Sequence, residues 1–179
     1  VNSNRMKPAI APLGLDYLAD SLRTARHEVR LLDLCFSEDL AADIERAVRT
    51  FAPDVIGVTV RNTDDCYFSG QAFFLPEIKQ IVELLRRAST APVVLGGVGF
   101  SIMPEAVMAF CGADFGIAGE GETAVNELLK ALEQKAGFEH VPNLLYRAGN
   151  SIRRNRSMPA DLSALPRCRS TASRVLASW

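Results

Sequence analysis

Residues 53–62 read Pro53-Asp54-Val55-Ile56-Gly57-Val58-Thr59-Val60-Arg61-Asn62. Segment 54–60 is a nearly continuous apolar run, which is typical of a strand buried on both faces of a parallel sheet. Two polar residues follow it directly, where the carboxyl end of such a strand would lie. Ligands of open α/β sheets bind at those ends. The stretch therefore predicts a fold class and the edge of the sheet where a site belongs.

On both sides of this run, strand-like and helix-like segments alternate, which favours a parallel α/β sheet. We expect strands at 28–34, 54–60, 92–95 and 114–118, and helices at 13–24, 37–51 (with Ser37 as N-cap), 76–88 and 104–111, with another after residue 122. Segments 144–147 and 151–153 flank Gly149-Asn150 and predict a β-hairpin. The predicted fold is a Rossmann-like or flavodoxin-like three-layer α/β/α domain with a parallel sheet, followed by a C-terminal β-hairpin linker.

The first strand of this pattern is nearly absent, since only Val1 and Asn2 precede the loop that leads to the first helix. In the flavodoxin-like strand order that strand is central. Either another segment fills its place or the sequence is a fragment, and we favour a fragment. We expect an α/β domain over residues 1–137, and a hairpin linker with an unstructured tail over 138–179.

Composition narrows the possible functions. The chain has 179 residues, 48% of them hydrophobic, and a formal net charge of -1, which predicts no nucleic-acid partner. The sequence contains no run of about 18 apolar residues, so no membrane span is predicted. The four cysteines show no zinc or iron–sulfur spacing, and with no signal-peptide pattern we expect reduced thiols in a cytoplasmic protein.

Two glycine-rich turns stand at predicted strand ends. Gly96-Gly97-Val98-Gly99 suggests either a ligand tail passing close to the backbone or a tight turn with positive φ. Gly119-Glu120-Gly121-Glu122 matches the dinucleotide fingerprint by letter, but it follows the last predicted sheet strand, and its acids would repel a pyrophosphate. These acids either favour the helix N-terminus or accept hydrogen bonds from a ligand.

The ordered set of motifs resembles the N-terminal cobalamin-binding domain of cobalamin-dependent radical S-adenosylmethionine enzymes. The matching stretches are Pro12-Leu13-Gly14-Leu15-Asp16-Tyr17-Leu18-Ala19, His27-Glu28-Val29, Pro53 to Thr59, Val94-Leu95-Gly96-Gly97, Met103-Pro104-Glu105 and Gly119 to Glu122. The resemblance covers roughly residues 1–165.

The resemblance implies corrinoid binding at the strand ends, with the nucleotide tail of cobalamin along the two glycine-rich turns. The residues expected to contact cobalamin are Asn2, Ser3, Pro12, Leu13, Gly14, Thr59, Arg61, Asn62, Gly96, Gly97, Val98, Gly99, Ser101, Gly119, Glu120, Gly121 and Glu122. No DxHxxG motif supplies a cobalt-ligating histidine, so the lower face of cobalt would be free of histidine, with Arg61 or Asn62 facing it.

A second departure from the family concerns catalysis. The sequence has no CxxxCxxC, so S-adenosylmethionine and a 4Fe–4S cluster would belong to a missing catalytic domain, in cis or in trans. We expect a non-catalytic, cobalamin-binding fragment of a radical S-adenosylmethionine methyltransferase or a related enzyme. The alternatives are a stand-alone corrinoid and methyl carrier, and a non-enzymatic α/β interaction module with a decayed site.

Overall fold

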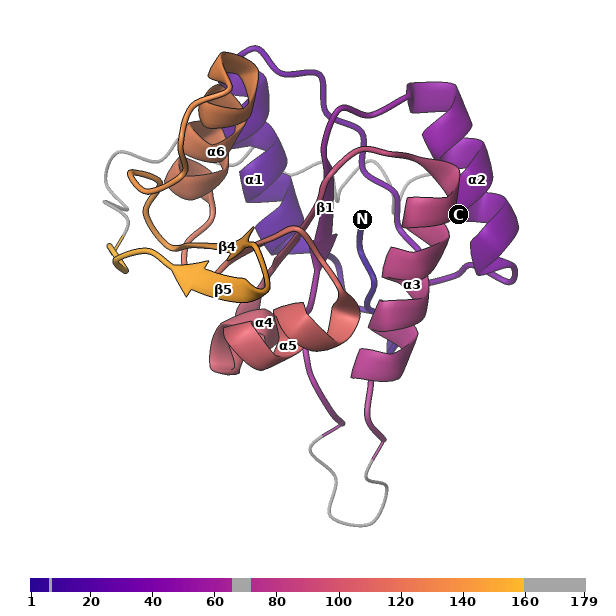
Figure 1. Cartoon of the computed structure of the whole chain (residues 1–179). Coiled ribbons are helices and arrows are strands. Elements are labelled where there is room, and N and C mark those ends of the chain that lie inside the picture. The colour runs from indigo at the N-terminus through magenta and orange to yellow at the C-terminus, as the bar shows by residue number, and fades with distance from the viewer. Residues whose placement is uncertain (7, 66–71, 160–179) are drawn as a thin grey trace.

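The computed structural model describes residues 1–6, 8–65 and 72–159 (Figure 1). Its helices are α1 (Leu13–Thr24), α2 (Leu40–Phe51), α3 (Leu75–Ala88), α4 (Val98–Ile102), α5 (Pro104–Cys111) and α6 (Glu122–Gln134). Its strands are β1 (Ile56–Thr59), β2 (Val93–Gly96), β3 (Phe115–Ile117), β4 (Leu144–Ala148) and β5 (Ser151–Arg154). The alternation expected from the sequence is confirmed. The predicted unstructured tail, residues 167–179, lies outside the described residues.

The sheet has the order β1-β2-β3-β4-β5. Strands β1, β2 and β3 run parallel, with Ile56 opposite Val93 and Val94 opposite Phe115. The predicted hairpin, β4–β5, is confirmed and joins the sheet because β4 pairs antiparallel with β3. The carboxyl ends of β1, β2 and β3 therefore share one edge, while the hairpin extends the sheet on the far side of β3.

The short N-terminal segment lies beside β1, in the place of a central strand. Asn2 forms parallel bridges to both Asp33 and Thr59. Its backbone N–H donates to Leu32 O at 2.8 Å, and its carbonyl accepts from Leu34 N at 3.1 Å. The predicted strand at 28–34 is reduced to this one bridge because a ladder needs a run of paired residues and Asn2 supplies only one.

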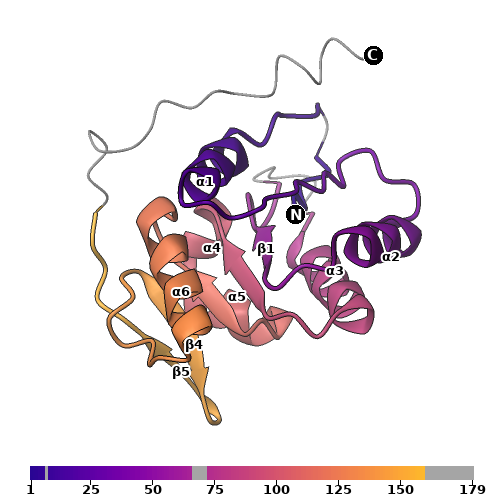
Figure 2. The ribbon, with the colours of Figure 1, turned by 90° about the horizontal axis from the view of Figure 1, so that it is seen from above.

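Helices cover both faces of the sheet, as seen from above in Figure 2. Helices α1 and α6 contact each other on one face, while α2, α3 and α5 pack in sequence on the other. Ile56, Val58 and Val60 belong to the core on the α2–α3–α5 side. Val94 and Ile117 belong to the core beneath α6. This is the predicted three-layer α/β/α arrangement.

The start of α2 differs from the expected one. Asp39 is the N-cap, and its side chain accepts a hydrogen bond from Ala42 N at 3.0 Å. Ser37 lies before the helix, where its hydroxyl donates to Asp43 Oδ2 at 2.7 Å. Ser37 is too far upstream to reach the first free amide groups, so the nearer carboxylate caps the helix.

Candidate functional site

The loops at the carboxyl edge of the sheet form the candidate site. They are the N-terminal loop after Asn2, the residues after β1, the turn between β2 and α4, and the turn between β3 and α6. Parallel strands bring these four loops to one edge. All of the residues expected to contact a ligand lie on this edge or at the start of α1, where Pro12 is the N-cap and Leu13 is 52% exposed.

The turn after β2 is shaped by contacts within the chain itself. Gly97 has φ 102°, and a β-carbon there would lie 2.7 Å from Val60 O. A β-carbon on Gly99 would lie 2.9 Å from the carbonyl of Arg61. The close backbone approach suggested by these glycines is thus made by segment 59–62, and the positive-φ turn accounts for Gly97 without a ligand. Between the two glycines, Val98 is 76% exposed.

Ser101 links the two glycine-rich turns. Its hydroxyl donates to Gly97 O at 2.9 Å and accepts from Gly119 N at 2.9 Å. Its only donor is therefore used inside the protein, although an oxygen lone pair remains for another donor. Gly96 pairs with Thr59 in the sheet. The ends of β1, β2 and β3 form one hydrogen-bonded rim.

The turn after β3 presents Glu120 to solvent, while Glu122 is half-buried. Gly119 has φ 101°, and Gly119 and Glu120 are exposed. Gly121 is the N-cap of α6, and Glu122 begins that helix. A carboxylate in the first turn interacts favourably with the helix dipole, which is the structural role foreseen for Glu122.

A cavity of about 280 Å³ lies between the N-terminal loop, the residues after β1 and the start of α3. Its walls include Ser3, Asn4, Arg61 and Asn62. Thus three of the predicted residues, Ser3, Arg61 and Asn62, line one hollow. The hydroxyl of Ser3 donates to Thr59 O, which holds the loop against β1.

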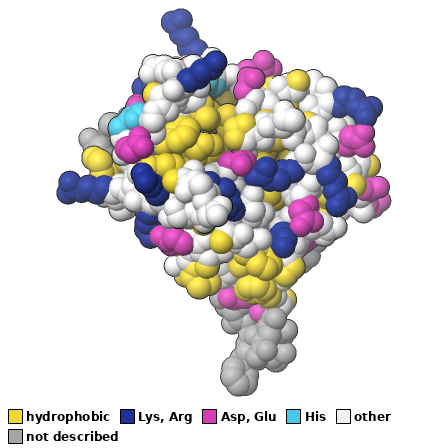
Figure 3. Space-filling view, in the orientation of Figure 1, with side chains coloured by type: hydrophobic (Ala, Val, Ile, Leu, Met, Phe, Trp, Pro, Cys, Tyr) yellow, Lys and Arg dark blue, Asp and Glu magenta, His cyan; other side chains and the backbone are white. Residues whose placement is uncertain are grey.

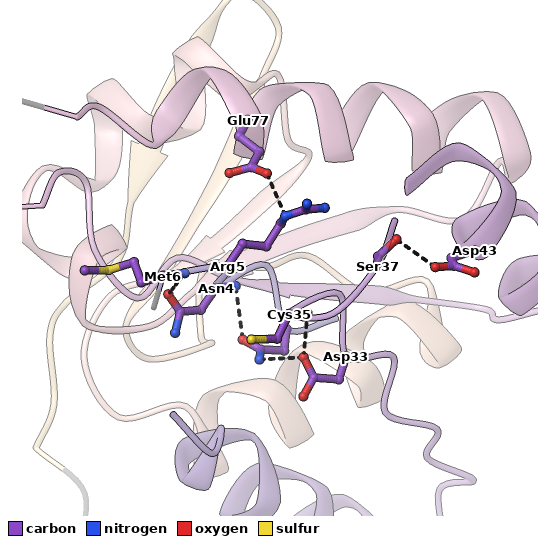
Figure 4. A network of polar contacts seen from close by, with 9 residues as sticks. Asn4, Arg5, Met6, Asp33, Cys35, Ser37, Asp43 and Glu77 are labelled. Carbon is purple, nitrogen blue, oxygen red and sulfur yellow. Dashed lines mark hydrogen bonds and ion pairs between the residues drawn. The ribbon is translucent and has the colours of Figure 1, made fainter. Parts of the chain in front are cut away.

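The same cavity has charged walls. Arg5 reaches from the N-terminal loop to Glu77 on α3, with 3.1 Å between Nε and Oε1 (Figure 4). Asn4 is 8% exposed, and its amide nitrogen is buried without a hydrogen-bond partner. A buried amide donor without an acceptor is costly, so a carbonyl of a bound molecule would stabilise it.

On the α1–α6 face, the middle of β1 is open. Gly57 is exposed although its strand neighbours Ile56 and Val58 are buried, and a β-carbon on Gly57 would meet nothing within 4 Å. In Figure 3, hydrophobic side chains gather between the α1–α6 layer and β1. Leu18 and Leu22 of α1, which pack against the core cluster beneath α6, are only partly buried. An apolar space between helices and sheet therefore adjoins the rim.

Sequence reasoning did not single out Gly57, Asn4 or Asn143 as site residues. Gly57 carried a signal, because a glycine inside an apolar strand run marks a close approach or an empty space. Asn4 and Asn143 carried none, since no local pattern in the sequence predicts that their side chains are buried.

The described residues show neither a metal cluster nor a membrane-spanning helix. Within residues 1–6, 8–65 and 72–159, no three His, Cys, Asp or Glu side chains gather as a metal site. Cys35 and Cys111 are free and buried. None of the helices in the described part of the chain is long and apolar enough to cross a membrane.

Comparison with known proteins gives consistent matches. The family model described as B12 binding domain matches residues 4–129. Tryptophan 2-C-methyltransferase of Streptomyces laurentii is 38% identical over 152 residues, which are 83% of this chain and 25% of the relative. Hopanoid C-3 methylase of Methylococcus capsulatus is 27% identical over 146 residues, 78% of this chain and 26% of the relative.

Solved structures match over the same region. The radical S-adenosylmethionine methyltransferase TsrM from Kitasatospora setae, with cobalamin and a 4Fe–4S cluster bound, superimposes with a TM-score of 0.83 at 36% identity, covering 87% of this chain and 28% of that one. The cobalamin-dependent radical enzyme OxsB shares the fold, with a TM-score of 0.70 at 18% identity. The chain thus spans a quarter to three-tenths of the length of the curated relatives it matches.

Proposed function

This chain belongs to the B12-binding domain family, and from that premise we propose that its rim of strand ends binds cobalamin as one part of a cobalamin-dependent radical S-adenosylmethionine methyltransferase. The single observation that carries the placement is the open, apolar space over Gly57, next to the rim. A ligand with a bulky ring and a long tail needs both an edge to lie on and a slot to enter.

The residues present fit such a ligand. A large side chain at position 57 would fill the space over Gly57, and we place the partly buried Leu18 and Leu22 of α1 at its apolar wall. At the edge, the buried amide nitrogen of Asn4 lacks an acceptor. The amide groups around a corrin ring offer such acceptors. Apolar walls with a few directed polar groups are typical of cofactor sites.

We propose that the nucleotide tail of cobalamin passes the ends of β1 and β2 towards the space over Gly57. Thr59 and Gly96, paired at these ends, would border its path, with Gly97, Ser101 and the turn Gly119 to Glu122 at the rim. On the opposite side of the rim, Pro12, Leu13 and Gly14 begin α1. Leu13 and Gly14 are exposed there, which supports a contact with the ligand.

The lower face of cobalt is proposed to meet Arg61 or Asn62, since no protein histidine stands in a DxHxxG motif. Arg61 is exposed and lines the cavity at the end of β1. Asn62 also lines it, and its amide donates to Met6 Sδ at 3.1 Å. The guanidinium of Arg61 offers only hydrogen-bond donors, so Arg61 would not donate an electron pair to cobalt.

Catalysis is proposed to require a second domain, in cis or in trans, that carries S-adenosylmethionine and a 4Fe–4S cluster. Bound cobalamin would supply methyl-transfer chemistry, while this chain would bind and orient it and limit access of water. Residues 1–137 would form the binding domain, and residues from 138 onward would lead away from it. A cytoplasmic location is part of the proposal, supported by the free thiols of Cys35 and Cys111.

Titration of the purified chain with hydroxocobalamin tests the proposal. We expect the protein peak in gel filtration to carry the absorbance of cobalamin in a one-to-one ratio. A colourless protein peak at saturating ligand would refute cobalamin binding. Paramagnetic resonance of the reduced complex tests the lower face of cobalt, because nitrogen coordination from the protein would contradict the proposed histidine-free environment.

A further inference from the structure

Asn143 lies in the loop before β4, and both polar atoms of its side chain form two hydrogen bonds each. Its amide nitrogen donates to Glu120 O at 3.3 Å and to Met158 O at 3.0 Å. Its amide oxygen accepts from Ser157 Oγ at 3.2 Å and from Met158 N at 2.8 Å. Asn143 is 6% exposed. A buried amide that uses both donors and both acceptor positions fixes its neighbours in place.

The backbone of Asn143 extends these connections. Its carbonyl accepts from Ala118 N at 3.0 Å, just after β3, and its N–H donates to Arg156 O at 3.1 Å. One residue therefore joins the end of β3, the Glu120 turn and segment 156–158, through which the chain leaves the hairpin.

These connections continue to the rest of the rim. Gly119, which precedes Glu120, donates its N–H to Ser101 Oγ, and Ser101 donates to Gly97 O. A path of hydrogen bonds thus runs from Met158 through Asn143 to the turns after β3 and β2. The path ends beside Thr59 and Val60, against which Gly97 packs.

We propose that Asn143 is a positioning residue that holds the Glu120 turn in its ligand-binding geometry and couples this turn to the departing segment 156–158. The inference rests on the proposed cobalamin site. The backbone of Asn143 alone does not require asparagine, because its φ is 61° and glycine adopts that angle without strain. The side chain is needed only for the bonds to Glu120, Ser157 and Met158.

This backbone geometry allows a clean test. Asn143→Gly removes the side chain and keeps the positive φ, while Asn143→Asp keeps the acceptor for Met158 N but loses both amide donors. Asn155→Ala is the matched control, because Asn155 also donates two hydrogen bonds, to Phe138 O at 2.6 Å and Val141 O at 2.8 Å, but touches no rim turn. All four proteins are titrated with hydroxocobalamin well below their unfolding temperatures.

We expect Asn143→Gly and Asn143→Asp to bind hydroxocobalamin about three- to tenfold more weakly than wild type, and Asn155→Ala to bind like wild type despite a similar loss of stability. We also expect hydroxocobalamin to slow amide hydrogen exchange in segment 156–158 of wild type but not of Asn143→Gly. Wild-type affinity in Asn143→Gly, or equal slowing in both proteins, would overturn the inference alone. Absence of binding by wild type would remove the proposed function and this inference with it.

Discussion

The ring of Phe100 lies directly against the backbone of Gly116. A β-carbon on Gly116 would be 2.2 Å from Cζ of Phe100, which is fully buried in α4. Gly116 pairs with Leu95 in the middle of the sheet. This contact seats α4, and with it the turn after β2, on the carboxyl half of the sheet. The geometry of the rim therefore depends on a glycine that is not part of it.

Gly116→Ala should destabilise the fold by about 1–3 kcal/mol, because the added methyl overlaps the Phe100 ring and neither the strand nor the packed helix can move freely. Chemical denaturation followed by circular dichroism measures the change. Gly14→Ala is the control. Gly14 is an exposed residue of α1, and a β-carbon there meets nothing within 4 Å. This change should therefore stabilise the protein by about 0.5–1 kcal/mol, because alanine favours a helix more than glycine does. Equal effects of the two substitutions would contradict the Phe100 contact.

Gly57→Leu should lower the affinity for hydroxocobalamin by about tenfold or more, since its side chain would enter the apolar space proposed for the ligand. Gly57→Ala should change affinity little, because one methyl fills only a small part of that space. Gly57→Ala should fold, as no atom lies within 4 Å of the added β-carbon, and circular dichroism checks the fold of Gly57→Leu. Spectroscopic titration gives the affinities, and a Gly57→Leu variant that binds like wild type would rule out this slot.

A substitution at Gly97 would not provide the same test. With φ 102° and Val60 O 2.7 Å from a β-carbon, Gly97→Leu strains the turn whether or not a ligand passes there. Loss of binding in that variant would have two explanations: the leucine blocks the nucleotide tail of cobalamin, or it distorts the turn itself.

Local patterns were sufficient to predict most of the architecture. Helix α1 has the bounds Leu13–Thr24 that its apolar spacing indicates, and the hairpin forms around Gly149, where φ is 61°. Both depend on residues close in sequence, whose periodicity and turn chemistry are readable directly. The family resemblance, carried by ordered motifs, is likewise confirmed by the match over residues 4–129.

The site was harder to predict because its features depend on distant partners. The glycines at 97 and 99 suggested a close approach, but the sequence could not show that Val60 and Arg61 make it. Asn143 and Glu120 are separated by 23 residues, and no local rule joins them. The strand expected at 28–34 also failed for a non-local reason, since among the described residues it has one bridge partner, Asn2.

Cys111 should resist alkylation in the native protein at pH 8. Burial raises the pKa of its thiol to about 11, although the charge of Lys79 opposes the shift. The neutral thiol is thus favoured in the folded state, and this contribution to stability is present below pH 9 and lost as pH rises towards 11. Mass spectrometry after iodoacetamide treatment, with and without denaturant, measures the modification. Rapid labelling of Cys111 without denaturant would contradict its burial.

At the amino ends of the strands, a substitution should lower the free energy of unfolding without changing the affinity for hydroxocobalamin. Asp114, just before β3, accepts from Val93 N at 2.8 Å and from Arg86 Nη2 at 2.9 Å, and Arg86 also donates to Gly112 O at 2.7 Å. These bonds join the amino ends of β2 and β3 to α3, away from the rim. Asp114→Ala should therefore cost about 1–3 kcal/mol of unfolding free energy, because it leaves the amide of Val93 without its acceptor, while Arg86 keeps its bond to Gly112 O.

The affinity of Asp114→Ala for hydroxocobalamin should stay within about twofold of wild type when measured below its unfolding temperature. The reason is positional: ligands of open α/β sheets meet the carboxyl ends of the strands, and Asp114 lies at the amino ends. Denaturation and titration of the same preparation give both quantities. Asp114→Asn should recover part of the lost stability, because its amide oxygen still accepts from Val93 N. A large loss of affinity in a folded Asp114→Ala would mean that the ligand is not held at the rim.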